Sequence, residues 1–242
     1  GGARLGRAIA LALGASGYDV AIHYRSSADG AKATADEIEA LGRKVHLIQG
    51  DLAKESDVAS MVDGAQKVLG PLTLLVNSAS VFEPDDIETM TRESWDMHME
   101  TNLRAPLKLS QDFAAQAPFG ANNLIINLVD QRVLKLTPQF LSYTMAKAAL
   151  FTLTKTLAQA LGPQGVRVNA VGPGPTLRNS RQSEEDWVKQ NEATVLGRGA
   201  TPDDIAAAVL YLVSASAVTG QMIAVDGGQH LTWQTPDALV KE

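Results

Sequence analysis

The chain has 242 residues, 45% of them hydrophobic, with a formal net charge of −6, so a sizeable core is possible. The acidic balance argues against nucleic acid as a partner, because a phosphate-binding surface needs a surplus of Lys and Arg. The absence of cysteine excludes a disulfide scaffold, a thiolate nucleophile and a thiolate metal site. No apolar run approaches the roughly 18 residues of a membrane span, so we expect no membrane partner.

Apolar periodicity predicts helices and strands that alternate along the whole chain. The predicted helices cover 4–16, 28–41, 55–69, 91–117, 142–161 and 200–214, and the predicted strands cover 19–24, 45–50, 72–77, 123–128, 166–171 and 222–226. The strands are mostly continuous apolar runs, which is typical of a parallel sheet covered by helices on both faces. We therefore predict an α/β fold with a Rossmann-type doubly wound parallel sheet in three layers, built as one domain over 1–242.

Two long irregular stretches, 80–89 and 172–199, follow the carboxyl ends of predicted strands. Doubly wound sheets bind their ligands at this edge, and long loops in such places are commonly functional. We assign the stretch at about 172–199 as a substrate loop. The acidic side chains of the other stretch, Glu83, Asp85 and Asp86, are expected to be solvated.

A glycine-rich turn opens the first predicted helix at Gly1, Gly2 and Gly6. Free N–H groups and the positive end of the helix dipole make such a turn suitable for an anion. A strand normally precedes this turn in dinucleotide-binding folds, and the sequence begins without one. We therefore expect the domain to be N-terminally incomplete, with its first strand missing from these 242 residues.

The end of the strand over 19–24 bears on the choice of nucleotide. Enzymes selective for NAD place an acid there on the ribose 2′-hydroxyl, whereas this strand ends at Tyr24 and continues into Arg25 and Ser26. An arginine beside hydroxyl groups suits a 2′-phosphate, because it offers charge-assisted donors in a fork. The pattern favours NADP(H), and the alternative is that Arg25 is a solvated loop residue.

Tyr143 and Lys147 are four residues apart and share one face of a predicted helix, while Asn102 lies inside the preceding long helix. Further along the chain, Asn77-Ser78-Ala79 ends a strand and the segment 167–174 reads RVNAVGPG. Together with Tyr143-Thr144-Met145-Ala146-Lys147, these ordered motifs resemble the short-chain dehydrogenase/reductase family over essentially the whole chain.

The resemblance implies a role for each matching residue. Tyr143 would be the general acid, Lys147 would hold the nicotinamide ribose and lower the pKa of the tyrosine, and Asn102 would fix a water that leads protons inward. Asp130 completes the expected catalytic set. The residues expected to bind the cofactor are Gly2, Arg4, Leu5, Gly6, Tyr24, Arg25, Ser26, Asp51, Leu52, Asn77, Ser78, Ala79, Pro173 and Gly174.

Two positions depart from the family pattern. Asp130 stands thirteen residues before Tyr143, where the family has its catalytic serine, and Arg4 replaces the middle glycine of the turn. Both departures are similar to pteridine reductases, which implies that Phe82 stacks on the substrate ring. The implied substrate-binding residues are Arg4, Ser80, Phe82, Asp130 and Tyr143. An ionised Asp130 only accepts hydrogen bonds, so it favours a nitrogen heterocycle over a ketone oxygen.

The sequence thus predicts an NADPH-dependent reductase that acts on a pterin, a dihydropterin or a dihydrofolate-like ring. One alternative is a carbonyl reductase or alcohol dehydrogenase of the same family, with a 3-oxoacyl or sugar-like substrate. The other is a non-catalytic NADPH-binding protein. The four histidines show no metal-ligand spacing, so we expect no metal. The family resemblance also implies a cytoplasmic homotetramer.

Overall fold

The structure is a computed structural model that describes residues 3–235 and 238. The strands in this part are β1 (Val20–Tyr24), β2 (Val45–Gln49), β3 (Leu74–Asn77), β4 (Asn123–Leu128), β5 (Val166–Pro173) and β6 (Met222–Val225). The α-helices are α1 (Arg4–Ala15), α2 (Ala28–Ala40), α3 (Glu55–Leu69), α4 (Arg92–Met99), α5 (Ala105–Gln116), α6 (Leu141–Leu161), α7 (Glu184–Glu192) and α8 (Pro202–Ser214). None of these helices is both long enough and apolar enough to cross a membrane.

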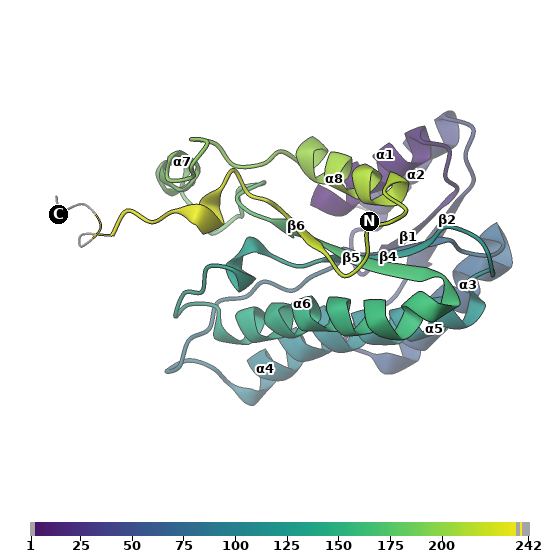
Figure 1. Cartoon of the computed structure of the whole chain (residues 1–242), viewed down its shortest axis with the longest axis horizontal. Coiled ribbons are helices and arrows are strands. Elements are labelled where there is room, and N and C mark those ends of the chain that lie inside the picture. Colours follow the sequence, from purple (N-terminus) through teal and green to yellow (C-terminus); the bar gives the residue numbers. More distant parts are fainter. Residues whose placement is uncertain (1–2, 236–237, 239–242) are drawn as a thin grey trace.

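The strands are all parallel and lie in two sheets, with the orders β1-β2 and β3-β4-β5-β6. Helices α1, α2 and α8 lie on one face of the sheets and α4, α5 and α6 on the other (Figure 1). Parallel strands are buried on both faces, which is why they read as continuous apolar runs. The predicted three-layer α/β fold is confirmed.

Strand β4 sits at the centre of the core, and all of its residues are buried. Leu124 and Ile126 pack toward α1 and α8 with Ile205, while Ile125 packs toward α5 and α6 with Phe113. Successive side chains of a strand point to opposite faces, so one short strand joins the two helical layers. The strand therefore holds its carboxyl end, which leads to Asp130, in a fixed position.

The helix predicted over 91–117 is interrupted. A π-helical segment, η1 (Glu100–Arg104), separates α4 from α5. Pro106 lies in the first turn of α5, and because proline has no N–H it cannot bond the carbonyl four residues earlier, at Asn102. Single π-helical turns accommodate such a break, and this one carries the fully buried Asn102. The interruption thus gives the asparagine a distinct place in the fold.

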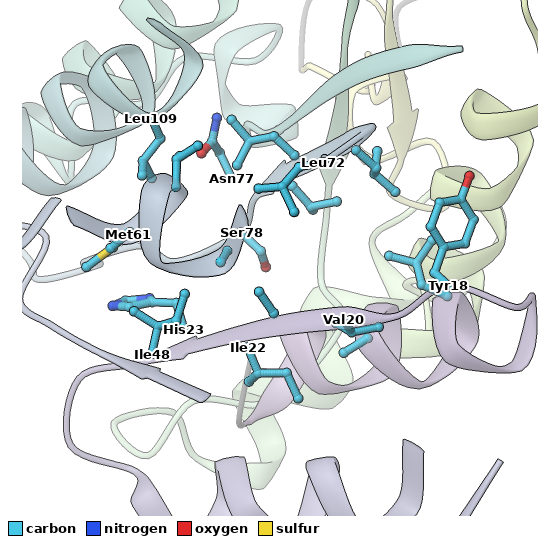
Figure 2. A pocket seen from close by; sticks show the side chains of 18 of the residues that line it. Tyr18, Val20, Ile22, His23, Ile48, Met61, Leu72, Asn77, Ser78 and Leu109 are labelled. Carbon is cyan, nitrogen blue, oxygen red and sulfur yellow. The ribbon is translucent and has the colours of Figure 1, made fainter. Parts of the chain in front are cut away.

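A cavity of about 430 Å³ separates β1 from β3. Figure 2 shows Val20, Ile22 and His23 along β1 on one side of it and Asn77 and Ser78 at the end of β3 on the other. The expected catalytic side chains do not line this cavity.

Candidate active site

The expected catalytic residues meet at the carboxyl end of β4. Asp130 follows this strand by two residues, and the first two turns of α6 bring Tyr143 and Lys147 beside it. Tyr143 is 5% exposed and Lys147 is 2% exposed. Residues four apart share one face of a helix, so the packing of α6 against the sheet buries both groups on the same side.

Direct hydrogen bonds connect this cluster. The Tyr143 hydroxyl donates to Oδ2 of Asp130 at 2.8 Å, and the backbone N–H of Arg132 donates to Oδ1 at 2.7 Å. The Lys147 ammonium donates to the backbone carbonyl of Leu128 at 2.7 Å. Both carboxylate oxygens of Asp130 therefore act as acceptors, whereas a serine offers a single side-chain oxygen that also carries a proton.

Burial sets the protonation of the three groups. Desolvation lowers the pKa of Lys147 to about 8 and raises the pKa of Asp130. It also raises the pKa of Tyr143, and the neighbouring Asp130 charge adds to that rise. The expectation that the pKa of Tyr143 is lowered was therefore wrong, because burial and the neighbouring Asp130 raise it. Tyr143 thus holds its proton at neutral pH.

Asn102 holds the loop that follows β3. Its amide donates to the carbonyl of Val81 at 2.9 Å and accepts the Val81 N–H at 2.9 Å. The Ser80 hydroxyl donates to the same amide oxygen at 3.0 Å. The side chain expected to fix a water is therefore engaged with protein groups, and what it directly determines is the position of Ser80 and Phe82.

The same loop is tied to the start of α6 by Asp85. Its carboxylate accepts the Ser94 hydroxyl at 2.6 Å and the Ser142 N–H at 3.0 Å. Burial would raise the pKa of Asp85, but the hydrogen bonds from Ser142 and Ser94 outweigh it, and the pKa is lowered. Asp85 is 6% exposed, so the expectation of a solvated side chain was wrong here. Glu83 is exposed, as expected, and Asp86 is half-buried.

Phe82 stacks on another side chain of the protein. Its ring lies parallel to that of Phe140, with centroids 4.2 Å apart and an interplanar angle of 5°. The Tyr143 ring meets Phe82 edge-on at 4.7 Å. The sequence prediction placed Phe82 at the substrate, and the structure sets this ring directly beside the expected proton donor.

The residues expected to bind the cofactor lie along the carboxyl edge of both sheets. Strand β1 ends at Tyr24 and is followed by Arg25 and Ser26, and β2 is followed by Asp51 and Leu52. Asn77 ends β3 and is followed by Ser78 and Ala79, and Pro173 ends β5 before Gly174. Leu5 and Gly6 lie in the first turn of α1, and Gly2 lies outside the described residues. The residues expected to bind the cofactor therefore come from several elements that end or begin at the same edge.

Several of these side chains also have structural partners. Leu52 packs in the core against Val58 and Met61, so only its backbone faces the sheet edge. A side chain at Gly174 would meet the backbone of Asp226 at 2.7 Å, so close approach to the end of β6 explains this glycine. Asn77 donates to Asn127 at 2.9 Å inside the core.

Arg4 reaches the substrate loop. Its backbone is left-handed, with φ of 51°, and its guanidinium donates to the carbonyls of Leu177 and Arg178 at 3.1 and 3.4 Å. The substrate loop expected over 172–199 contains α7, and Arg181 joins it to the other loop through Glu83 at 2.8 Å. Both irregular stretches thus meet over one site.

Phe140 and Arg132 are the two site residues that the sequence reasoning missed. The Arg132 guanidinium carbon lies 5.2 Å from the centroid of the Phe140 ring. Phe140 lies before the first residue of α6 and has a left-handed backbone, so helical spacing gives no signal for it. Arg132 carries no such signal either. Within the described residues, no cluster of His, Cys, Asp or Glu could hold a metal ion.

The fold and this edge define the class of protein, a doubly wound α/β oxidoreductase of the dinucleotide-binding type. The comparisons identify the family within it. A family model described as enoyl-(acyl carrier protein) reductase matches residues 2–230. The chain belongs to the short-chain dehydrogenase/reductase family, as its motifs predicted.

Curated relatives and solved structures give further points of comparison. The chain is 34% identical over 231 residues to the 3-oxoacyl-[acyl-carrier-protein] reductase FabG of Staphylococcus epidermidis, covering 94% of this chain and 95% of that protein. It is 40% identical to FolM alternative dihydrofolate reductase 1 from Brucella canis, complexed with NADP, at a TM-score of 0.92, with 99% and 95% of the two chains covered. The FolM protein from Brucella suis is 42% identical at a TM-score of 0.93, with coverage of 98% and 94%.

Proposed function

We propose that this chain is an NADPH-dependent reductase of a pterin, a dihydropterin or a dihydrofolate-like heterocycle. The observation that carries the proposal is the Tyr143 hydroxyl bonded to Asp130 at 2.8 Å. An acidic group takes the place of the family's serine there, directly beside the proton donor. A charged carboxylate would repel a ketone oxygen but accept hydrogen bonds from ring N–H groups.

The residues at the N-terminus of α1 and those that follow β1 fit NADP(H) as the cofactor. Ala3 provides no side-chain cap for α1, and the first turn of that helix contains no acid, so its N–H groups and dipole suit a phosphate. Arg25 and Ser26, after β1, suit a 2′-phosphate. The FolM structures and a Burkholderia cenocepacia short-chain dehydrogenase that is 32% identical are complexes with NADP.

The proposed chemistry reduces a C=N bond of the ring. Bound NADPH would supply the hydride to the carbon. Tyr143 donates its proton to the neighbouring nitrogen, which completes the C–H and N–H bonds of the product. The tyrosinate left behind regains a proton from solvent, and the Asp130 carboxylate, whose pKa is raised by burial, can take up that proton and pass it on across its hydrogen bond to the tyrosine oxygen, which returns Asp130 to the ionised form. The pKa of Lys147 is lowered to about 8 by burial, so this side chain is mostly protonated at neutral pH, and its Nζ lies 5.7 Å from the Tyr143 ring centroid.

Similarity to the FolM alternative dihydrofolate reductases supports the heterocyclic substrate. The second candidate is a 3-oxoacyl reductase, and the specific observation in its favour is the 34% identity to FabG. Asp130 favours the heterocycle on electrostatic grounds, since a 3-oxoacyl group would present a ketone oxygen to this position. The homotetramer and the cytoplasmic location stay predictions from the family resemblance.

The deciding experiment measures NADPH oxidation with dihydrobiopterin or dihydrofolate, beside a panel of ketones that includes a 3-oxoacyl thioester. We expect turnover of a pterin or folate at rates well above those of the ketones. Ketone turnover without pterin or folate activity would replace the proposal with its rival. Binding of NADPH without turnover of either class would make the chain a non-catalytic binding protein.

A further inference from the structure

Phe140 covers a face of Phe82 with a parallel ring at 4.2 Å. This is the stacked geometry that a flat heterocycle would adopt on an aromatic side chain. We propose that Phe140 is a mobile ring that fills the substrate-stacking position in the chain without substrate, and that a planar heteroaromatic ring displaces it. The inference rests on the proposed function, because Phe82 is the residue expected to stack on the substrate.

The backbone of Phe140 is suited to such a movement. Its φ and ψ are 58° and 51°, in the left-handed region, where a bulky side chain other than glycine is strained. Phe140 is the N-cap residue of α6, and its side chain makes no capping hydrogen bond. A rotation of the backbone at this position would relieve the strain and carry the ring off Phe82, at the cost of the first hydrogen bond of α6, from the Thr144 N–H to the Phe140 carbonyl at 2.8 Å.

Phe82 belongs to a loop that is held in place. Asn102 bonds both backbone groups of Val81, and Arg181 donates to the carbonyl of Phe82 at 2.6 Å. The next residue, Glu83, receives a second bond from Arg181 at 2.8 Å. Of the two stacked rings, Phe82 is therefore the fixed wall and Phe140 the one that can leave.

Arg132 forms the wall on the other side of the Phe140 ring, with its guanidinium carbon 5.2 Å from the ring centroid. Its Nη1 bonds the Thr137 hydroxyl, but its buried Nε has no hydrogen-bond partner among the described residues. A buried donor without an acceptor is costly. A heterocycle in place of Phe140 would lie between an aromatic ring and a guanidinium, and an acceptor atom on it could satisfy Nε.

This arrangement selects for one class of ligand: a planar, electron-poor heteroaromatic ring with an acceptor at its edge. An aliphatic acyl chain has no flat face to stack on Phe82. If it displaced Phe140, the stacking contact between the two phenylalanines would be lost and not replaced. Phe140 thus acts as a specificity-determining residue, because only a ring that stacks at least as well as phenylalanine can replace it.

The test measures binding rather than turnover, so that it stands apart from the proposed function. Folic acid is titrated by calorimetry into wild-type protein and variants, each with NADP⁺ present so that no reduction occurs. Phe140→Ala should bind folic acid about threefold to tenfold more tightly, because no ring has to be displaced. Arg132→Met should bind it several-fold more weakly. The matched controls are Phe119→Ala, which removes a ring that is 96% exposed, and Arg92→Met, at a side chain 81% exposed.

The outcomes separate the two proposals. Unchanged or weaker folic acid binding by Phe140→Ala, with a melting temperature like that of the wild type, overturns the displacement of Phe140 even if pterins are reduced. Tighter binding without any pterin turnover supports the displacement and rejects the reductase. If Phe140→Ala is unstable, Phe140→Gly, which fits the left-handed backbone, gives the same comparison. No folic acid binding by any variant overturns the inference.

Discussion

At the scale of single residues, the site depends on which buried group holds a proton. Asp130, Tyr143 and Lys147 lie together where water cannot solvate them, and each pKa is shifted toward the neutral form. A buried charge is unfavourable unless a partner stabilises it. Burying the cluster therefore costs free energy of folding, and variants of Asp130 and Lys147 should change stability or activity.

Replacing the carboxylate tests its part in the reaction. Asp130→Ser restores the residue type that the family has at this position and removes the acceptor of the Tyr143 proton. We expect kcat/KM for pterin or folate reduction to fall at least tenfold, since general acid–base groups contribute about 10²–10⁴ in rate. Steady-state kinetics check this, with Asp63→Ser, on an exposed face of α3, as the control. Unchanged pterin rates would remove Asp130 from the mechanism.

The lysine should destabilise the protein without cofactor at neutral pH. Its pKa is about 8 in the fold, against 10.5 for a free lysine, so the unfolded chain binds a proton more tightly between these values. Lys147→Met should therefore raise the free energy of unfolding by about 2–3 kcal/mol below pH 8, after allowance for the lost bond to Leu128. The gain should shrink as the pH rises from 8 to 10.5.

Urea unfolding across this pH range measures the difference between the two proteins. Lys67→Met, at a lysine whose side chain is 72% exposed, is the control and should show no such pH dependence. A Lys147→Met variant that is less stable at pH 7 than at pH 10, relative to the wild type, contradicts the buried charge. The same variant should lose reductase activity.

At the scale of elements, the site depends on a π-helical segment within a long helical run. The π-helical segment between α4 and α5 turns Asn102 toward the loop after β3, and Asp85 in that loop is bonded to the start of α6. Three elements far apart along the chain are thus held at one point. A regular helix would repeat its side chains at every turn and would place Asn102 differently.

Asn102→Ala should leave the Val81 N–H without its partner and the Val81 carbonyl with only the Ser80 hydroxyl, at 3.3 Å. We expect a loss of about 1–3 kcal/mol in stability, because buried polar groups would be unsatisfied. The KM for the pterin should rise more than the KM for NADPH, since the loop carries Phe82. Thermal unfolding and kinetics test both effects, with Gln111→Ala on the exposed face of α5 as the control. Equal changes in the two KM values would contradict a local role.

At the scale of the whole molecule, the carboxyl edge at which we expect the cofactor to bind spans both sheets. Arg25 and Asp51 follow the strands of one sheet, and Asn77 and Pro173 end strands of the other. A dinucleotide bound along this edge would contact the folded chain only, so its binding should stabilise the fold.

NADPH should therefore raise the melting temperature strongly. A ligand at 100 times its Kd stabilises the native state by about 2.7 kcal/mol, and NADH at the same concentration should give a smaller shift. Arg25→Ala should reduce the NADPH shift to that of NADH, while Lys44→Ala, before β2 at the opposite edge, should not. Equal shifts with NADH and NADPH in the wild type would remove Arg25 as a 2′-phosphate ligand.

The sequence by itself determined the alternation of helices and strands, the three-layer fold and the family. These features can be predicted because the hydrophobic period and the spacing of motifs are properties of short stretches of sequence. The pairing of Tyr143 with Lys147 on one helix face is an example. Only the tertiary structure decided that Asp85 is buried, that Phe140 covers Phe82 and that Asn102 serves a loop. Those contacts join segments far apart in the chain, and the loops that meet at a sheet edge depend on packing rather than on local pattern.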